Sequence, residues 1–393
     1  MRGARTLGLI VALLAACAAG IWLGGHPAKL PEELRDAFVD DSAGLTVEAS
    51  ELIEDNYFRE VPHADLIDSS LQGMVRGLRR DYRDRFSEYF SPRTLVRFNE
   101  EIEGRFSGVG LSVTEVERGL RVVRVFAGSP AERAGIAIGE TIVSVDGRSI
   151  AGLDSVAATT RIKGPEGTEV EVGVLPAGGG EVRRVRLTRA EIEVPVVSSG
   201  IRRAAGEKLG YVRLAAFSSG AHGALREAVR KLQRRGATGL LLDLRANGGG
   251  LLDEAVLSAS VFLPEGEEVV STRSRTQGER SYETQGGNLP RLPLVVLIDR
   301  GTASAAEILA AALADNAGAP VVGTRSFGKG VFQQEIGLSN GGALKLTIGE
   351  YFTPDGTNLA GKGIQPDVRV ADAPDTPRDE ALQHGLTVLA AER

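Results

Sequence analysis

The sequence predicts an α/β protein of several domains, and three observations support this. The chain has 393 residues, which is enough for two or three domains. Its hydrophobic pattern changes from helical spacing to short strands near residue 104, and to strands separated by helices near residue 191. Apolar residues make up 42% and charged residues 25%, ordinary values for globular domains, so each segment can build its own core.

Residues 1–29 are expected to form a signal or anchor segment. Two arginines precede an uncharged run over residues 6–25, which is about long enough to cross a bilayer as a helix. Three outcomes are open: a cleaved signal peptide, an uncleaved anchor, or a lipobox-like LAAC at 14–17 that makes Cys17 a lipidated first residue. All three place the body outside the cytoplasm, in the periplasm or cell envelope, and we favour anchoring by the helix or by a lipid on Cys17.

Residues 30–103 form the predicted N-terminal helical region. Apolar residues recur at helical spacing after Leu45 and again after Ile67, and the helical pattern extends to about Glu100. Two short amphipathic helices form only a weak core on their own. We therefore expect them to pack on another domain or on a second copy of the chain, which makes a homodimer a candidate assembly.

Residues 104–190 form the second predicted domain, a small sheet with short helices. A helix begins after Ser129, with proline in its first turn, and Asp154 caps another that ends near Lys163. The strands are expected at 108–113, 120–125, 141–145, 169–175 and 181–187.

Residues 191–371 form the third predicted domain, and a tail over 372–393 completes the chain as a C-terminal helix. Amphipathic and alanine-rich helices at 224–235 and 303–314 alternate with apolar strands, which indicates a sheet with helices on its faces. The strands are expected at 210–214, 239–244 and 294–298.

Two residues of the third domain are candidates for catalysis. Ser304 follows a buried strand and opens a helix, where the helix N-terminus and nearby amides stabilise an oxyanion, although serine is also a common helix cap. Lys329 lies between two glycines among apolar residues. Dry surroundings lower a lysine pKa, and a neutral amine can take a serine proton, although a surface lysine on a loop fits the same pattern.

A glycine-rich loop follows the strand at 239–244. Its three glycines, 248–250, present bare backbone amides that suit an oxyanion, an extended peptide, a phosphate or a plain tight turn. Neither dinucleotide nor P-loop spacing fits this loop, which argues against nucleotide binding.

Composition excludes several other classes. The net charge of −6 gives no basic bias, so we expect no nucleic-acid partner. The four histidines lack metal-ligand spacing and a catalytic setting, which argues against a metal site and a trypsin-like triad. Cys17 is the only cysteine, so the body has neither a disulfide nor a cysteine nucleophile.

Three motifs in order resemble the carboxy-terminal processing proteases, the tail-specific, S41-type Ser/Lys peptidases that carry a PDZ domain. They are DLRANGGG at 243–250, TASAAEI at 302–308 and SFGKGVFQ at 326–333. The resemblance implies N-terminal helices, an α+β PDZ domain at 104–190 and a crotonase/ClpP-like α/β serine protease core at 191–371. It also implies a serine endopeptidase that needs no cofactor and cleaves exported polypeptides with flexible, often apolar C-terminal tails.

The resemblance also implies roles for individual residues of the core. Ser304 would be the nucleophile, Lys329 the general base and Gln333 the residue that orients the lysine amine. The backbone amides of Gly250 and Ala305 would form the oxyanion hole. Glu307 fits the family pattern, and we interpret it as supporting structure because glutamate stabilises a helix N-terminus.

For the PDZ domain, the resemblance implies that the loop Ser107, Gly108, Val109, Gly110 and Leu111 binds a peptide carboxylate. The peptide would then add as a strand beside the sheet. Lys163 stands where family members often carry an arginine that couples peptide binding to the active site, and a lysine loses the bidentate fork. The PDZ domain would deliver substrate or regulate the enzyme, alone or with regulatory or adaptor proteins.

Two other functions are weighed against the peptidase. A catalytically silent PDZ adaptor that only binds C-termini needs none of Ser304, Lys329 and Gln333. A crotonase-like enzyme acting on a thioester shares the core fold and glycine-rich loop, but a serine–lysine pair and a PDZ module are not expected there.

Overall fold

The computed structural model describes residues 41–372 and 378–392, and divides the chain into two units. The leader expected at residues 1–29, including Cys17, lies outside the described residues. Within the described ranges, no helix is both long and apolar enough to cross a membrane.

The first unit contains residues 41–91 and the strand segment 335–346. Its helices are α3 (Asp41–Asn56) and α4 (His63–Tyr82), as the helical spacing predicts. The short strand β1 (Glu88–Phe90) lies inside the segment for which the sequence predicts helix alone. That prediction was wrong at β1, because three residues are too few to show strand periodicity. β1 pairs antiparallel with the start of β18 (Ala343–Phe352), which buries Tyr89 and Phe90.

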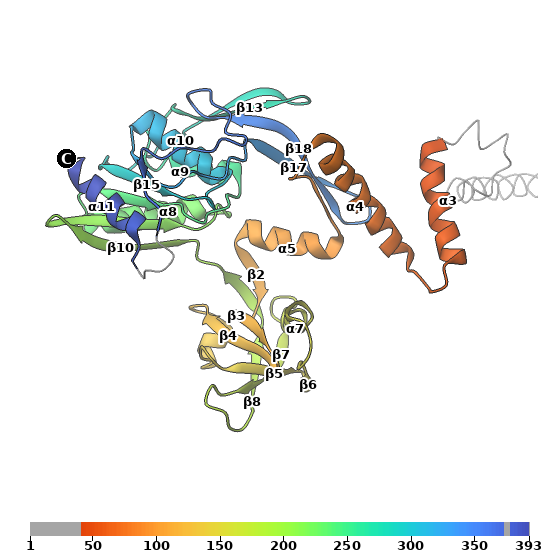
Figure 1. The fold of residues 1–393 in the computed structure, drawn as a ribbon. Helices are drawn as coiled ribbons and strands as arrows, with labels where there is room; N and C mark the ends of the chain where they lie inside the picture. Colours follow the sequence, from red (N-terminus) through yellow and green to blue (C-terminus); the bar gives the residue numbers. More distant parts are fainter. Residues whose placement is uncertain (1–40, 373–377, 393) are drawn as a thin grey trace, which may run out of the picture. The chain divides into compact units, whose positions relative to one another are not determined.

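The second unit begins with helix α5 (Pro92–Glu103) and contains a small sheet module. Its strand order is β3-β4-β5-β7-β8, with β6 paired to β5 (Figure 1). The sequence predicts one strand over 108–113, but the structure breaks it at Val109–Gly110, where Gly110 has a positive φ of 83°. The elements are β2 (Arg105–Gly108), β3 (Leu111–Val116), β4 (Gly119–Val125), α6 (Pro130–Arg133), β5 (Thr141–Val145), β6 (Arg148–Ser149), α7 (Ser155–Ile162), β7 (Glu169–Leu175), β8 (Arg183–Thr188) and β9 (Ala190–Glu193).

The same unit contains a larger sheet with the order β10-β11-β12-β15-β16-β19. β10 is antiparallel to β11, and every other neighbouring pair is parallel. The strands are β10 (Val197–Ala204), β11 (Glu207–Leu214), β12 (Leu240–Asp243), β15 (Leu294–Ile298), β16 (Val321–Gly323) and β19 (Val368–Arg369).

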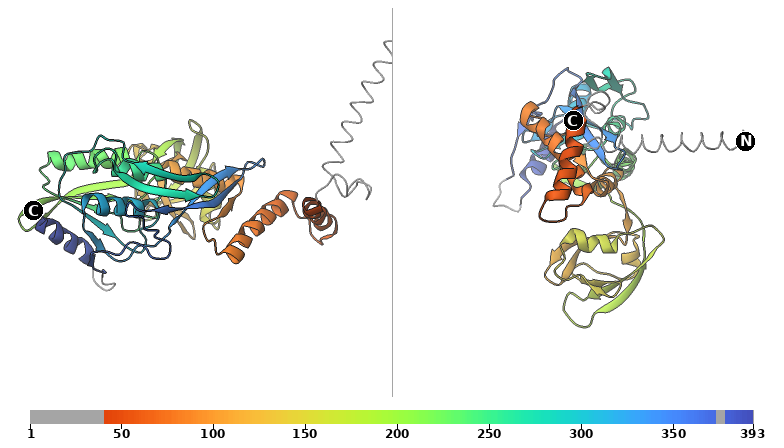
Figure 2. Two further views of the ribbon diagram at one scale, coloured as in Figure 1. Left: turned by 90° about the horizontal axis from the view of Figure 1, so that it is seen from above. Right: turned by 90° about the vertical axis from the view of Figure 1, so that its right-hand side faces the viewer.

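Helices cover both faces of this sheet, which explains why its central strands are continuously apolar. Leu240 and Leu242 pack with α8 (Ala221–Arg234), α9 (Leu252–Ala259) and α10 (Ala305–Ala317). Leu241, between them, points to the other face and packs against Leu386 and Leu389 of α11 (Glu380–Ala391). Figure 2 (left) shows α8, in green, and α11, in dark blue, on opposite sides of the sheet.

The strands missed by the sequence prediction include four of a second sheet. They are β13 (Glu268–Ser274), β14 (Gly278–Glu283), β17 (Val331–Gly337) and β18, which form a second sheet with β1. β14 is almost wholly exposed, so it lacks the alternation of apolar and polar residues that would reveal a strand.

Candidate active site

Ser304 lies at the turn between buried strand β15 and helix α10. The Asp299 carboxylate holds the turn by accepting hydrogen bonds from the amides of Ala246 and Gly301, both at 2.8 Å. The Thr302 hydroxyl donates to the Leu244 carbonyl at 2.8 Å. Ser304 itself has φ 56° and ψ −121°, a backbone conformation that disfavours any residue with a Cβ atom. The turn therefore holds the serine in a strained position at the helix N-terminus.

Lys329 lies on the loop between β16 and β17, where two glycines allow close backbone approach. A Cβ atom on Gly328 would lie 2.7 Å from the amide nitrogen of Gly363, and one on Gly330 would lie 2.4 Å from that of Ala360. Both glycines also have positive φ, at 80° and 64°. This packing against residues 359–363 fixes the course of the lysine loop.

Glu307 joins the serine turn to the lysine loop. Its Oε2 accepts hydrogen bonds from the amides of Ser304, at 2.9 Å, and Lys329, at 3.1 Å. Its Oε1 accepts from the Ser326 hydroxyl at 2.5 Å and the Gly328 amide at 2.7 Å. The side chain is fully buried, and α10 supplies it from the first helical turn. One carboxylate therefore sets the backbone positions of both candidate catalytic residues.

Tyr351 completes the surroundings of this carboxylate. Its hydroxyl donates to Glu307 Oε2 at 3.3 Å. Burial raises the pKa of Tyr351, and the negative charge of Glu307 raises it further, so the phenol stays protonated and remains a donor.

The glycine-rich loop packs directly against the serine turn. A Cβ atom on Gly249 would lie 2.8 Å from Ser304 Cβ and 3.0 Å from the Ala305 nitrogen. Gly250 has φ 146° and lies against the Phe217 backbone, which accepts a hydrogen bond from the Leu251 amide. Within the described residues, the amides of Gly250 and Ala305 have no hydrogen-bond acceptor. Two available donors therefore come from neighbouring segments at the serine.

Gln333 lies on β17, four residues after Lys329. Its side-chain amide donates to the Thr347 hydroxyl of the neighbouring strand β18 at 3.2 Å. The carboxamide is thus held by a cross-strand contact.

The five loop residues of the predicted peptide site lie together at the junction of β2 and β3. The Ser107 hydroxyl donates to the Gly164 carbonyl at 2.7 Å, which ties the loop to the end of α7. Gly110 lies so close to Ser129 that a Cβ atom there would approach the Ser129 Cβ to 2.1 Å. Gly108, Val109 and Leu111 complete the segment, with Val109 buried in the module's core.

Lys163 caps α7 and points toward α5. Its ammonium forms an ion pair with the Glu100 carboxylate and lies 5.3 Å from the centre of the Phe106 ring. The lysine therefore joins the small module to the helix that precedes it in the chain.

A second polar cluster, the C-terminal clamp, consists of Arg245, Asp243, Asp372 and Asp379. The Arg245 guanidinium bridges the fully buried Asp243, at 2.7 Å, and Asp379 at the cap of α11, also at 2.7 Å. The hydrogen bonds and charges of these acids hold the Arg245 pKa above its usual value, against the lowering effect of burial. Burial and the Asp243 charge raise the pKa of Tyr211, which donates to Asp243, to about 12. The sequence motif DLR marked these residues, but nothing in it revealed their partner in the tail.

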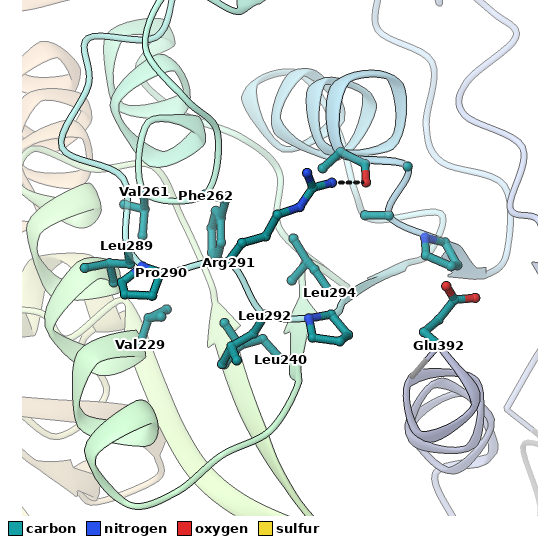
Figure 3. A pocket seen from close by; sticks show the side chains of 15 residues that line it. Val229, Leu240, Val261, Phe262, Leu289, Pro290, Arg291, Leu292, Leu294 and Glu392 are labelled. Carbon is teal, nitrogen blue, oxygen red and sulfur yellow. Dashed lines mark hydrogen bonds between the residues drawn. The ribbon is translucent and has the colours of Figure 1, made fainter.

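A cavity of about 400 Å³ lies at the opposite, amino end of the parallel strands (Figure 3). Leu240, Leu294 and Pro320, at or next to the starts of three strands, line it. Arg291 crosses it and donates to the Ala317 carbonyl at 3.0 Å. None of the candidate catalytic residues lines this cavity, so the site at Ser304 is separate from it.

No group of histidine, cysteine and carboxylate side chains in the described ranges is arranged to hold a metal ion. The candidate chemistry rests on a hydroxyl, an amine and backbone amides.

Two segments of the sequence match known protein families. Residues 208–370 match peptidase family S41, and residues 121–175 match the PDZ domain. The carboxy-terminal processing protease CtpA of Bacillus subtilis is 32% identical over 83% of this chain and 68% of its own length. A carboxy-terminal-processing protease of Bartonella bacilliformis is 36% identical over 78% of this chain and 69% of its own length.

A solved structure agrees with this grouping. The photosystem II D1 C-terminal processing protease superposes with a TM-score of 0.51 at 30% identity, covering 88% of this chain and 97% of that protein. The fold and site thus define a serine peptidase with a PDZ domain. The chain belongs to peptidase family S41, among the carboxy-terminal processing proteases. This confirms the family, the fold class and the serine peptidase activity that the motifs predict.

Proposed function

We propose that this chain is an endopeptidase that uses Ser304 as nucleophile and Lys329 as general base. The observation that carries the proposal is the Glu307 carboxylate, whose Oε2 accepts from the amides of both residues at 2.9 and 3.1 Å. A serine and a lysine on separate loops need such a link to meet repeatedly in one geometry.

The reaction is acyl transfer in two steps. Ser304 attacks the scissile carbonyl while the neutral amine of Lys329 takes the hydroxyl proton. The amides of Gly250 and Ala305 stabilise the resulting oxyanion. The lysine returns its proton to the leaving amine, and water then hydrolyses the acyl-enzyme with Lys329 again as base. Gln333 orients the lysine amine.

The substrates are polypeptides with flexible, often apolar C-terminal tails. The PDZ domain binds such a tail through the loop 107–111, and delivers it to the core or relieves inhibition. Regulatory proteins and a second copy of the chain are further proposed partners. The body works outside the cytoplasm, anchored through residues 1–29 by a helix or by a lipid on Cys17, and cell fractionation tests this placement.

The decisive experiment compares cleavage of an unfolded protein with an apolar C-terminus by the wild type, Ser304→Ala and Lys329→Ala. Both variants should lose activity by about 10³-fold or more, because nucleophile and base act as a unit. Lys231→Ala is the control: this lysine is exposed on helix α8, and the variant should cleave at the wild-type rate. Substantial cleavage by Lys329→Ala would refute the dyad. Peptide binding without cleavage by any form would favour the PDZ adaptor instead.

A further inference from the structure

A second cavity, of about 720 Å³, lies at the carboxyl ends of the parallel strands. It is lined by residues at or after the carboxyl ends of β12, β15, β16 and β19, by Gln365 and Pro366 just before β19, and by Ala381 at the start of α11. Crevices beyond the carboxyl ends of parallel strands are the usual ligand sites of α/β sheets. Four arginines line this one, although the chain as a whole has a net charge of −6.

The acidic residues of the cavity are already engaged within the fold. Asp299 accepts hydrogen bonds from the amides of Ala246 and Gly301 and from the Thr302 hydroxyl. Asp372 accepts from Arg245 at 3.2 Å and from the Ala381 amide at 3.0 Å. Arg245 is in turn neutralised by Asp243 and Asp379 in the C-terminal clamp. The charged groups of these three residues therefore already have partners within the fold.

Three arginines remain: Arg300, Arg325 and Arg369. In residues 41–372 and 378–392, none of them has an ion-pair or hydrogen-bond partner for its guanidinium. All three side chains are exposed to solvent, so a ligand in the cavity can reach their guanidinium groups. A guanidinium presents a planar fork of N–H donors that matches the oxygens of a carboxylate or a phosphate.

We propose that this cavity is a binding site for a small organic oxyanion with two or more carboxylate or phosphate groups. Three positive charges around one cavity favour a polyanion over a single charge. A volume of about 720 Å³ lies in the range of small-molecule sites, roughly 300–1,000 Å³, and exceeds what one phosphate fills.

The site lies next to both catalytic loops along the chain. Arg300 precedes Ser304 by four residues, and Arg325 precedes Lys329 by four. A ligand held by both arginines joins the serine turn to the lysine loop. Binding therefore stabilises the folded protein whether or not the chain cleaves peptides, which keeps this proposal independent of the proposed function.

The test measures binding of citrate and of pyrophosphate to the full-length protein by calorimetry, with thermal unfolding as a second readout. At least one probe should bind with a Kd below about 1 mM, and the Tm should rise with its concentration. Stronger binding of citrate identifies a carboxylate ligand, and stronger binding of pyrophosphate a phosphate ligand. If neither citrate nor pyrophosphate binds at about 1 mM, the proposal is overturned.

A matched pair of triple variants separates the site from general charge. Replacement of Arg300, Arg325 and Arg369 by glutamine should weaken binding about tenfold or more. The control replaces three exposed arginines of the PDZ domain, Arg118, Arg121 and Arg148, by glutamine, and should bind as the wild type does. Equal weakening in both triple variants would contradict a localised site. Should the first triple variant fail to fold, the three single variants provide the same comparison.

Discussion

Glu307 and Asp243 are two fully buried carboxylates near the carboxyl edge of one sheet, and they are stabilised in opposite ways. Glu307 accepts only from backbone amides and hydroxyls of the serine turn and the lysine loop. Asp243 is paired with the guanidinium of Arg245, which reaches on to Asp379 at the cap of α11.

The difference shows two roles for a buried carboxylate: Glu307 positions two loops, and Asp243 helps to attach the C-terminal helix to the sheet. Several neutral donors bind one carboxylate, and this holds the backbones of the two loops in fixed positions relative to each other. A catalytic geometry requires such fixed positions. An arginine bridging two acids joins distant parts of the chain, and its removal leaves a buried charge. We therefore expect changes near Glu307 to affect activity first, and changes in the C-terminal clamp to affect stability first.

Within this comparison, the largest effect is expected from Gly249→Ala, beside the serine turn. The new methyl group would meet Ser304 Cβ at 2.8 Å at a backbone φ of 99°. It should lower kcat/KM about 100-fold or more, as the loss of an oxyanion donor does. The matched control is Gly248→Ala, which meets nothing within 4 Å and should retain most activity. Equal activity of the two variants would contradict the inference that the packing of this loop against the serine turn matters for activity.

Glu307→Gln should lower kcat about tenfold or more while the protein remains folded. The amide group places an N–H donor where backbone donors already point, so the two loops separate. Glu307→Ala should also lower the free energy of unfolding by about 3 kcal/mol, because several buried donors lose their acceptor. Kinetics and urea unfolding measure both effects. Glu254→Gln is the control, since this buried glutamate caps the start of α8 and should affect stability alone.

Arg245→Ala should destabilise the protein by about 3–5 kcal/mol, because Asp243 then stays buried without a positive charge to pair with it. Urea unfolding measures the change. Asp379→Asn should cost much less, because the Asp379 side chain is 42% exposed and water replaces the lost contact. Similar losses in the two variants would show that burial of Asp243 is not the cause.

The smallest effect concerns pH. The hydrogen bond from Arg245, helped by the Leu382 amide and the charges of Arg245 and Arg213, holds the Asp379 pKa below its usual value. Its stabilising contribution is therefore fully present above the unfolded-state pKa of about 4, and is lost as the pH falls through the lower folded-state pKa. Asp379→Asn should unfold with a shallower dependence on pH below about 4. If the pH dependence of the free energy of unfolding is unchanged in this variant, Asp379 does not contribute to the acid sensitivity of the C-terminal clamp.

The sequence predicts the central strands β12 and β15 and the helix α10, because buried parallel strands and alanine-rich helices have strong local patterns. Its motifs also mark Ser304 and Lys329 as candidates for catalysis. The shared role of Glu307 was missed, because its partners lie about twenty residues further along the chain. The Arg245–Asp379 pair spans 134 residues, and no local pattern records a contact of that kind.

Ser304 has one more consequence, which follows from its φ of 56°. Only glycine adopts this conformation without strain, so the proposed nucleophile lies at a position where the backbone disfavours any side chain. Replacement of Ser304 by glycine would relieve this strain and at the same time remove the proposed nucleophile. Backbone stability and the proposed chemistry therefore make opposite demands on the residue at this position.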